Sequence, residues 1–255
     1  MHFLSAAHSD IGTTKQNNQD SLCLKIADTK LGEIAFVVVS DGMGGLKKGE
    51  LASATVIRTF SDWFDKVFPN NLGNTVDLKQ IAEQWGNLIS SLNYKIGEYG
   101  INTGIQLGTT ICAIIIINGK ALVCNVGDSR AYSLGSNILQ ITKDHSVIAM
   151  EIETGRITKE QAKFDPRRSV LTQCIGASQN VTPDFYEVTA IPGTAFIICS
   201  DGFVHEISNE EIFSNLNPKL VDDENSIKPR LIDLVERIKS RGEKDNISVV
   251  YIKNV

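Results

Sequence analysis

Short, strongly apolar runs along the chain predict β-strands. Two of them, 22–28 and 33–40, are joined by a short polar turn that contains Gly32. Two more, 109–117 and 120–126, flank the dipeptide Asn118–Gly119, which favours a hairpin because both residues tolerate a positive φ. Further strands are predicted at 130–135, 137–142, 196–200 and 246–252, the first two as a second hairpin.

Apolar residues at helical spacing predict two long helices between these strands, over 51–67 and 78–99, and a third before the last strand. Each has one apolar face and must pack on another element. The faces comprise Leu51, Val56, Phe60, Trp63, Phe64 and Val67; Leu78, Ile81, Trp85, Leu88, Leu92, Ile96 and Tyr99; and Leu231, Leu234, Val235 and Ile238. Ser208 with Glu211, and Thr158 with Gln161, have the spacing of capping boxes that open shorter helices.

The order of these elements predicts an α+β fold. Helices arrive in blocks and do not alternate singly with strands, which favours largely antiparallel sheets over a doubly wound parallel sheet. No Pro/Ser-rich or charged linker divides the 255 residues, and the sequence shows no internal repeat. We therefore expect one domain spanning 1–255.

Composition excludes several classes of function. The hydrophobic content of 42% and the charged content of 22% are those of a globular protein. The net charge is −5 and no Lys/Arg run is longer than the pair Lys47–Lys48, so we expect no nucleic-acid partner. The aliphatic run at 111–117 is far shorter than the roughly 20 residues of a membrane span, so we expect no membrane insertion.

The cysteines and the first residues bear on the compartment. The five cysteines have no paired spacing, and Cys112, Cys124 and Cys199 lie in apolar runs, which favours free buried thiols. The start, MHFLSAAHSDIG, has neither the basic head nor the long apolar segment of a secretory signal. We therefore expect a cytoplasmic protein, and the absence of closely spaced His/Cys clusters argues against structural zinc.

Four carboxylates lie where predicted strands end or begin. Asp41, Asp128 and Asp201 each follow an apolar strand, and Asp245 directly precedes one. In antiparallel sheets the start of one strand lies beside the end of its neighbour, so all four can gather at one edge. Taken singly, each can equally be a turn former, because Asp-Gly is common in turns.

Together the four carboxylates predict a metal site. Clustered carboxylates repel one another and are costly when partly buried unless a cation neutralises them. Ligands that are all oxygen select Mg²⁺, Mn²⁺ or Ca²⁺ over zinc or copper. Gly42, which follows Asp41, permits a close approach of the backbone, so its carbonyl could be a further ligand.

Six motifs in register resemble the metal-dependent protein phosphatases of type 2C. They are DGMGGLKKGELAS (41–53), GTT (108–110), NVGDSRAY (125–132), TKDHS (142–146), SDGF (200–203) and KDNISVVYI (244–252). The resemblance runs from Asp10 to Ile252, and Met43 with the glycines after it is similar to the bacterial branch.

This resemblance implies an αββα sandwich with two or three Mn²⁺ or Mg²⁺ ions at one end between the sheets. Asp41 matches the carboxylate that bridges two metals, and Gly42 lends its carbonyl to the second. Asp201 and Asp245 match the other ligands of the first metal, and Asp128 with Asp201 those of a third. The segment from His145 to Gly176, called the flap segment below, matches the variable flap beside the active site.

The implied activity is hydrolysis of phosphoserine and phosphothreonine in proteins by a metal-activated water. No protein nucleophile is needed, which agrees with the absence of a recognisable Ser/His/Asp or Cys/His constellation. The resemblance further implies phosphoprotein substrates, a cognate Ser/Thr kinase whose action is reversed, and a monomer.

The motif near the N-terminus departs from the family pattern of Arg, two residues, Asn, Glu, Asp. The chain has KQNNQD at 15–20, so Lys15 replaces the arginine and Gln19 the glutamate, while Asn18 and Asp20 remain. Lys15 can neutralise a phosphate oxygen but lacks the bidentate fork of arginine, and Gln19 offers a carbonyl oxygen without charge. We expect weaker occupancy of the second metal. These two changes also motivate an alternative, a weak or inactive relative that binds a phosphoprotein as a regulator.

Other departures concern protons and supporting residues. Met43 and Leu46 do not provide the histidine that some relatives have near the metals, and His145 is interpreted as a structural hydrogen bonder. His205 stands where relatives often carry a carboxylate that serves the third metal. Arg130 is expected to pair with a carboxylate behind the site, and Asn246 to orient the backbone beside Asp245. Thr109 and Thr110 are interpreted as strand residues near the site.

Overall fold

Two antiparallel sheets form the centre of the molecule. The computed structural model describes residues 1–43, 48–73, 75–162 and 164–255, and within these ranges each sheet has five strands. The first, in spatial order, contains β1 (Phe3–Asp10), β10 (Ile247–Asn254), β9 (Ala195–Cys199), β6 (Arg130–Leu134) and β7 (Ile138–Gln140). The second contains β2 (Asp20–Thr29), β3 (Gly32–Asp41), β4 (Ile111–Ile117), β5 (Lys120–Val126) and β8 (Asp184–Thr189).

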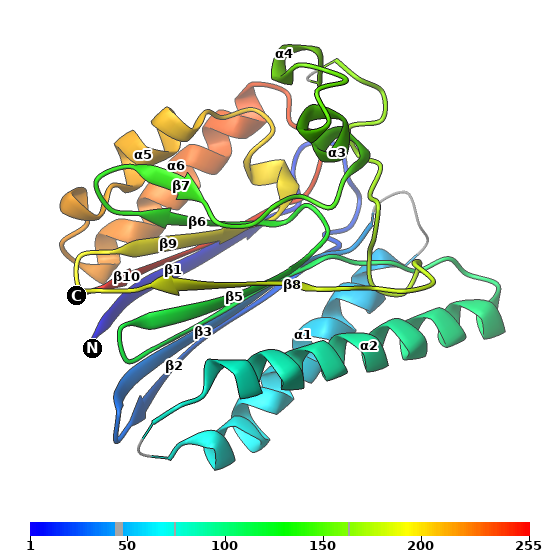
Figure 1. Ribbon diagram of the computed structural model, residues 1–255. Helices are drawn as coiled ribbons and strands as arrows, with labels where there is room; N and C mark the ends of the chain where they lie inside the picture. Colours follow the sequence, from blue (N-terminus) through cyan, green and yellow to red (C-terminus); the bar gives the residue numbers. More distant parts are fainter. Residues whose placement is uncertain (44–47, 74, 163) are drawn as a thin grey trace.

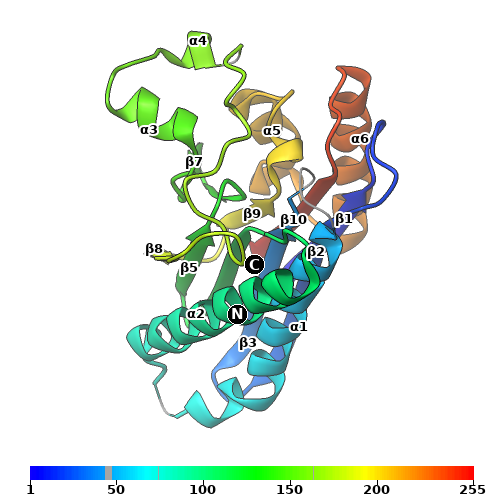
Figure 2. The ribbon, with the colours of Figure 1, turned by 90° about the vertical axis from the view of Figure 1, so that its right-hand side faces the viewer.

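Helices cover the outer face of each sheet, so the predicted αββα sandwich is confirmed (Figure 1). The helices α1 (Gly49–Lys66) and α2 (Leu78–Thr103) pack on the second sheet, and α5 (Asn209–Leu216) and α6 (Ile227–Ser240) on the first. The short helices α3 (Val147–Glu153) and α4 (Lys159–Ala162) belong to the flap segment and stand away from the sheets (Figure 2). No helix in the described ranges combines the length and apolar character needed to cross a membrane.

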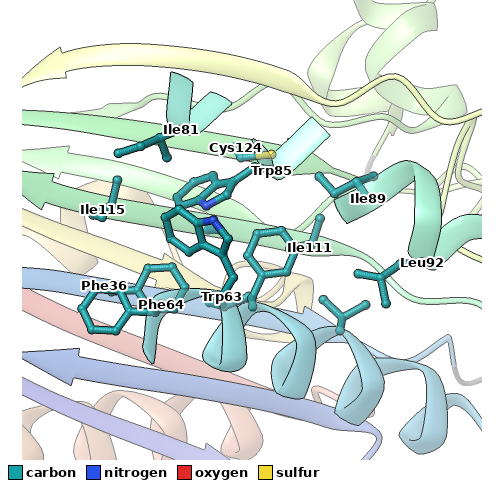
Figure 3. Close-up of a cluster of buried hydrophobic side chains, with 14 of the residues drawn as sticks. Phe36, Trp63, Phe64, Ile81, Trp85, Ile89, Leu92, Ile111, Ile115 and Cys124 are labelled. Carbon is teal, nitrogen blue, oxygen red and sulfur yellow. The ribbon is translucent and has the colours of Figure 1, made fainter. Parts of the chain in front are cut away.

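Strand β3 shows how one apolar run serves two cores. Ile34, Phe36 and Val38 face α1 and α2, whereas the alternate residues face the other sheet. The ring of Phe36 stacks on Phe64 with centroids 4.7 Å apart, and Trp63 meets Trp85 edge-on at 5.5 Å (Figure 3). A strand buried on both faces must be apolar throughout, which explains why its run was easy to recognise.

The predicted strands and long helices are present, with corrections at their margins. Strands β1 and β8 were not predicted, because polar and partly exposed residues interrupt their short apolar runs. Thr109 and Thr110 precede β4 and are not part of it, although Thr109 bridges to Gly42 and Ile175. Leu51, Val67 and Tyr99, assigned to apolar faces, are exposed near helix ends.

Both predicted capping boxes open helices. The Ser208 hydroxyl accepts from the backbone of Glu211, whose side chain accepts in return, at the start of α5. Thr158 and Gln161 make the same exchange at α4, with distances of 2.8 and 3.2 Å. Each box satisfies N–H groups that have no partner within the helix.

Candidate metal centre

The strand-terminal carboxylates lie at one end of the sandwich. Asp20 opens β2 and is the cross-strand partner of Asp41, the last residue of β3. Asp201 follows β9 and Asp245 precedes its neighbour β10, where the Ser200 N–H donates to the Ser248 carbonyl at 3.0 Å. Asp128 follows β5. Antiparallel pairing thus brings together residues that are far apart in the sequence.

Electrostatics confirm that these carboxyl groups face one another. Burial raises the pKa of Asp41 well above its usual range, and the charges of Asp20, Asp201, Asp128 and Asp245 raise it further. Burial likewise raises the pKa of Asp20 to about 7, against the opposing effect of hydrogen bonds from Ser248 and Ser200. The pKa of Asp128 is raised by burial and by the charges of Asp201 and Asp144. Ionising the whole group in this setting is costly without a cation.

Two side-chain cations contact the cluster. Nζ of Lys15 lies 2.7 Å from Oδ1 of Asp245, and Nε2 of His205 lies 3.3 Å from Oδ2 of Asp201. Nδ1 of His205 contacts Oε2 of Glu243 at 3.1 Å. Burial would lower the pKa of His205, but the charges of Asp201 and Glu243 outweigh it and raise the value to about 9.

The donor set suits a hard cation. Oδ1 of Asp20 and Oδ1 of Asp201 are buried without a hydrogen-bond partner, and an acceptor in that position gains from a bound cation. Across the described ranges, no three His, Cys, Asp or Glu side chains stand as a ready-made cage around one point. Lys15 contacts Asp245 and His205 contacts Asp201, so these two carboxylates must exchange those partners to bind an ion. The oxygens offered select magnesium or manganese over softer metals.

Gly42 is required by the close packing around it. A Cβ at this position would lie 2.4 Å from the Gly49 carbonyl oxygen and 2.6 Å from that of Gln19. The Gly42 N–H donates to the Gln19 carbonyl at 3.1 Å, which ties the residue after Asp41 to the N-terminal loop. Nε2 of Gln19 donates to Oε2 of Glu50 at 3.2 Å. Residues 44–47 of this motif, including Leu46, lie outside the described residues.

Two asparagines hold the loop that carries Lys15 and Gln19. Oδ1 of Asn246 accepts from the Gln19 N–H at 2.9 Å, and its Nδ2 donates to the carbonyls of Ile11 and Asn17. Oδ1 of Asn18 accepts from the Asp20 N–H at 3.1 Å. The side chain of Asn246 therefore acts on the N-terminal loop more than on the backbone beside Asp245.

A family model described as protein phosphatase 2C matches residues 10–244. The chain belongs to the protein phosphatase 2C family. Membership confirms the predicted class of enzyme, a metal-dependent protein-serine/threonine phosphatase. The regulatory alternative gains no support from the comparisons.

Individual relatives of this phosphatase agree with the assignment. It is 30% identical over 222 residues to the serine/threonine phosphatase stp of Listeria welshimeri, which covers 86% of this chain and 84% of the relative. The solved structure of Stp1 from Staphylococcus aureus is 26% identical, with a TM-score of 0.84 over 100% of this chain and 96% of the other. A catalytic domain of PstP, solved with two manganese ions, is 27% identical with a TM-score of 0.77, covering 98% and 97%.

Arg130 of the phosphatase pairs with Asp144, as expected of a carboxylate partner. Nε and Nη2 of the guanidinium donate to the two carboxylate oxygens at 3.0 and 2.7 Å, and Nη1 donates to the Tyr132 hydroxyl. This bidentate pair links β6 to the loop that leads into the flap segment.

Several contacts of the centre were not foreseen from the sequence. Thr110 accepts from the Asp41 N–H at 3.0 Å and contacts the Ser129 hydroxyl at 2.6 Å, so it joins two carboxylate-bearing loops. Glu243 supports His205, and Glu50 supports Gln19. Thr110 and Glu50 lie in the quoted motifs, and Glu243 is two residues before Asp245, so only their proximity in sequence could have singled them out.

Proposed function

We propose that the phosphatase reaction takes place at this carboxylate cluster, which forms a centre for two or three Mn²⁺ or Mg²⁺ ions. Asp41, Asp201 and Asp245 are assigned to the catalytic ions together with the Gly42 carbonyl, and Gln19 to the second ion. Asp128, with Asp201, is assigned to a third. When bound, the ions lower the pKa of a water molecule and offset the charge that develops on phosphorus. The observation that supports the proposal most is the buried, unpartnered Oδ1 of Asp201 within mutually repelling carboxyl groups.

The side chains around the cluster have separate tasks in this proposal. Lys15 binds a phosphate oxygen once it leaves Asp245, as a single charge and not as a bidentate fork. The exact placement of Lys15 and Gln19 depends on Asn246 and Asn18, which fix their loop. His205 orients Asp201 through its contacts with that residue and Glu243.

The wider setting follows from the chemistry. Substrates are proteins that carry phosphoserine or phosphothreonine, selected by the flap segment, and a cognate Ser/Thr kinase supplies them. The five cysteines are free, which supports a reducing, cytoplasmic setting. We further propose that the chain acts as a monomer and as a single domain.

Purified protein, Mn²⁺ and a phosphothreonine peptide test this assignment. We expect phosphate release that stops with EDTA, returns with excess Mn²⁺, and is lost in Asp201→Asn. The Asp201→Asn protein should retain its circular dichroism spectrum and bind less Mn²⁺ by calorimetry. Undiminished turnover in EDTA, or unchanged Mn²⁺ binding by Asp201→Asn, would overturn the assignment.

A further inference from the structure

The returning end of the flap segment is fastened next to Asp41. Ile175 and Thr109 exchange two backbone hydrogen bonds, at 2.9 and 3.0 Å. The neighbouring Thr110 donates its N–H to the Asp41 carbonyl at 2.9 Å. One side of the candidate metal centre is therefore joined to the flap segment by main-chain bonds.

The other side is joined through the ring of His145. Nδ1 of His145 accepts from the Gly127 N–H at 3.2 Å and from Nε2 of Gln173 at 2.8 Å. Because a backbone N–H can only donate, Nδ1 carries no proton, and the proton on Nε2 points to Oδ2 of Asp184 at 3.1 Å. The main chain adds two bonds of 2.8 Å, from His145 N–H to the Gly127 carbonyl and from Thr172 N–H to the His145 carbonyl.

Gln173 can take only one orientation in this network. Its Oε1 accepts from the Thr182 N–H and its Nε2 donates to the Thr182 carbonyl, both at 2.9 Å. The same Nε2 then aims its second hydrogen at His145. The amide of Gln173 therefore connects the end of the flap segment, the segment before β8 and the His145 ring.

Gly127 connects this hydrogen-bond network to Asp128. Its φ of +103° favours glycine, and a Cβ there would lie 2.5 Å from Cγ2 of Thr110. The Gly127 peptide is thus held between Thr110 on one side and His145 on the other. The backbone of Asp128, which follows immediately, cannot shift without breaking one of these contacts.

We propose that His145 is a positioning residue, which together with Gln173 holds the Gly127–Asp128 loop against the end of the flap segment and thereby sets the affinity of Asp128 for its cation. The proposal rests on the assignment of Asp128 made above. It makes the cation site at Asp128 depend on residues that do not touch the ion, an arrangement in which substitution typically costs tenfold to a hundredfold in affinity.

Three variants test the link. His145→Leu removes the ring acceptor, Gln173→Met removes the amide at similar volume, and His145→Asn retains an acceptor near the position of Nδ1. Gln161→Met is the matched control, because it makes the same change in the flap segment at a glutamine that only caps α4. Gln173 is partly exposed, so its variant remains informative should His145→Leu fail to fold.

The first measurement is the hydrogen-exchange rate of the Gly127 amide in the metal-free protein, monitored by nuclear magnetic resonance. We expect exchange at least tenfold faster in His145→Leu and in Gln173→Met, and near the native rate in His145→Asn and Gln161→Met. The second is a Mn²⁺ titration by calorimetry, in which one binding step, assigned to the Asp128 site, should weaken about tenfold in the first two variants only. A lower kcat with little change in KM should accompany the weaker Mn²⁺ binding.

The outcomes separate this inference from the proposed function. If Gly127 exchange and every Mn²⁺ binding step are unchanged in Gln173→Met, the positioning role is wrong, whatever happens to turnover. If exchange quickens but no Mn²⁺ step changes, the link exists and Asp128 does not bind the ion, which also overturns the inference. Failure of the proposed function would appear separately, as Mn²⁺ binding that Asp201→Asn leaves intact.

Discussion

Nζ of Lys15 lies 2.7 Å from Oδ1 of Asp245, so the residue in place of the family arginine is paired with a carboxylate assigned to metal binding. Burial would lower the pKa of Lys15, but the hydrogen bond and the charges of Asp245 and Asp41 outweigh it and raise the pKa. The ammonium group therefore stays charged, and in the proposed function it competes with cations for Asp245. Occupation of the proposed metal site and release of Lys15 toward phosphate are then expected to be coupled.

Lys15→Met should separate these two effects. We expect apparent Mn²⁺ affinity to rise a few fold, because a competing charge is lost, and kcat/KM on a phosphothreonine peptide to fall about tenfold or more, the cost of a hydrogen bond to a charged group. Calorimetry and steady-state kinetics measure the two. Lys244→Met, at an exposed neighbour of Asp245, is the control. Weaker Mn²⁺ binding with an unchanged kcat/KM would show that Lys15 serves the fold and not the phosphate.

Gln19→Glu should make the metal-free protein less stable and should increase the rise in melting temperature that Mn²⁺ produces. The substitution replaces the amide that donates to Glu50 with a second carboxylate, at a cost of about 1–3 kcal/mol. Thermal unfolding with and without Mn²⁺ measures this. The exchanged pair Gln19→Glu with Glu50→Gln should restore metal-free stability. An identical melting temperature in all three proteins would contradict the contact.

Lys15→Arg combined with Gln19→Glu restores both family residues. We expect higher activity at limiting Mn²⁺, because arginine grips phosphate with a fork and glutamate adds charge at the second ion. Phosphate release is measured across a Mn²⁺ series. If the double variant is no better than an active parent at any Mn²⁺ concentration, the explanation given for the second ion is wrong.

The metal-free protein should lose stability as the pH rises from 5.5 to 7.5. Asp20 has a pKa of about 7 when folded against an ordinary 3.8, so the folded state binds more protons and its stability falls between these values. Asp20 alone accounts for about 2 kcal/mol over this interval. His205 acts in the same direction, because its stabilisation is complete below 6.5 and is lost as pH passes about 9.

Urea unfolding in the presence of a chelator, at pH 5.5 and at pH 7.5, measures this change in stability. Mn²⁺ at pH 7.5 should reverse the loss, and Asp20→Asn should flatten the dependence. A metal-free protein whose stability is constant or rises over this interval would contradict the raised carboxyl pKa values.

Gly42→Ala should abolish activity while leaving the sheets intact. The added methyl group would lie 2.4 Å from the Gly49 carbonyl oxygen, and two backbone segments must then separate. We expect a loss of at least about a hundredfold in kcat/KM, since small displacements of catalytic groups have effects of that size. Gly86→Ala in α2 is the control, because a Cβ there would meet no atom within 4 Å apart from its chain neighbours and its own helix backbone, and the change should stabilise the helix. Equal activity of the two variants would remove the role given to Gly42.

Sequence reasoning reached the interior strands and the four carboxylates for the same reason. A strand such as β3, buried on both faces, must be apolar, and a charged residue at its end, here Asp41, is then conspicuous. The edge strands β1 and β8 lack that contrast. The contacts Lys15–Asp245, Gln19–Glu50 and His145–Gln173 join positions that no periodicity relates, so only the packed chain could reveal them.

The two ends of the chain lie side by side, because β1 pairs with β10 in a register that matches Phe3 with Asn254. The antiparallel strands both span the distance between that margin and the carboxylates, since Asp10 is matched with Ile247. An immobilising tag or a fused reporter at either end would consequently project from the margin opposite the carboxylate cluster. A linker that joins the two ends could be very short. New ends could then be cut in an exposed turn, which makes circular permutation a practical way to engineer this phosphatase.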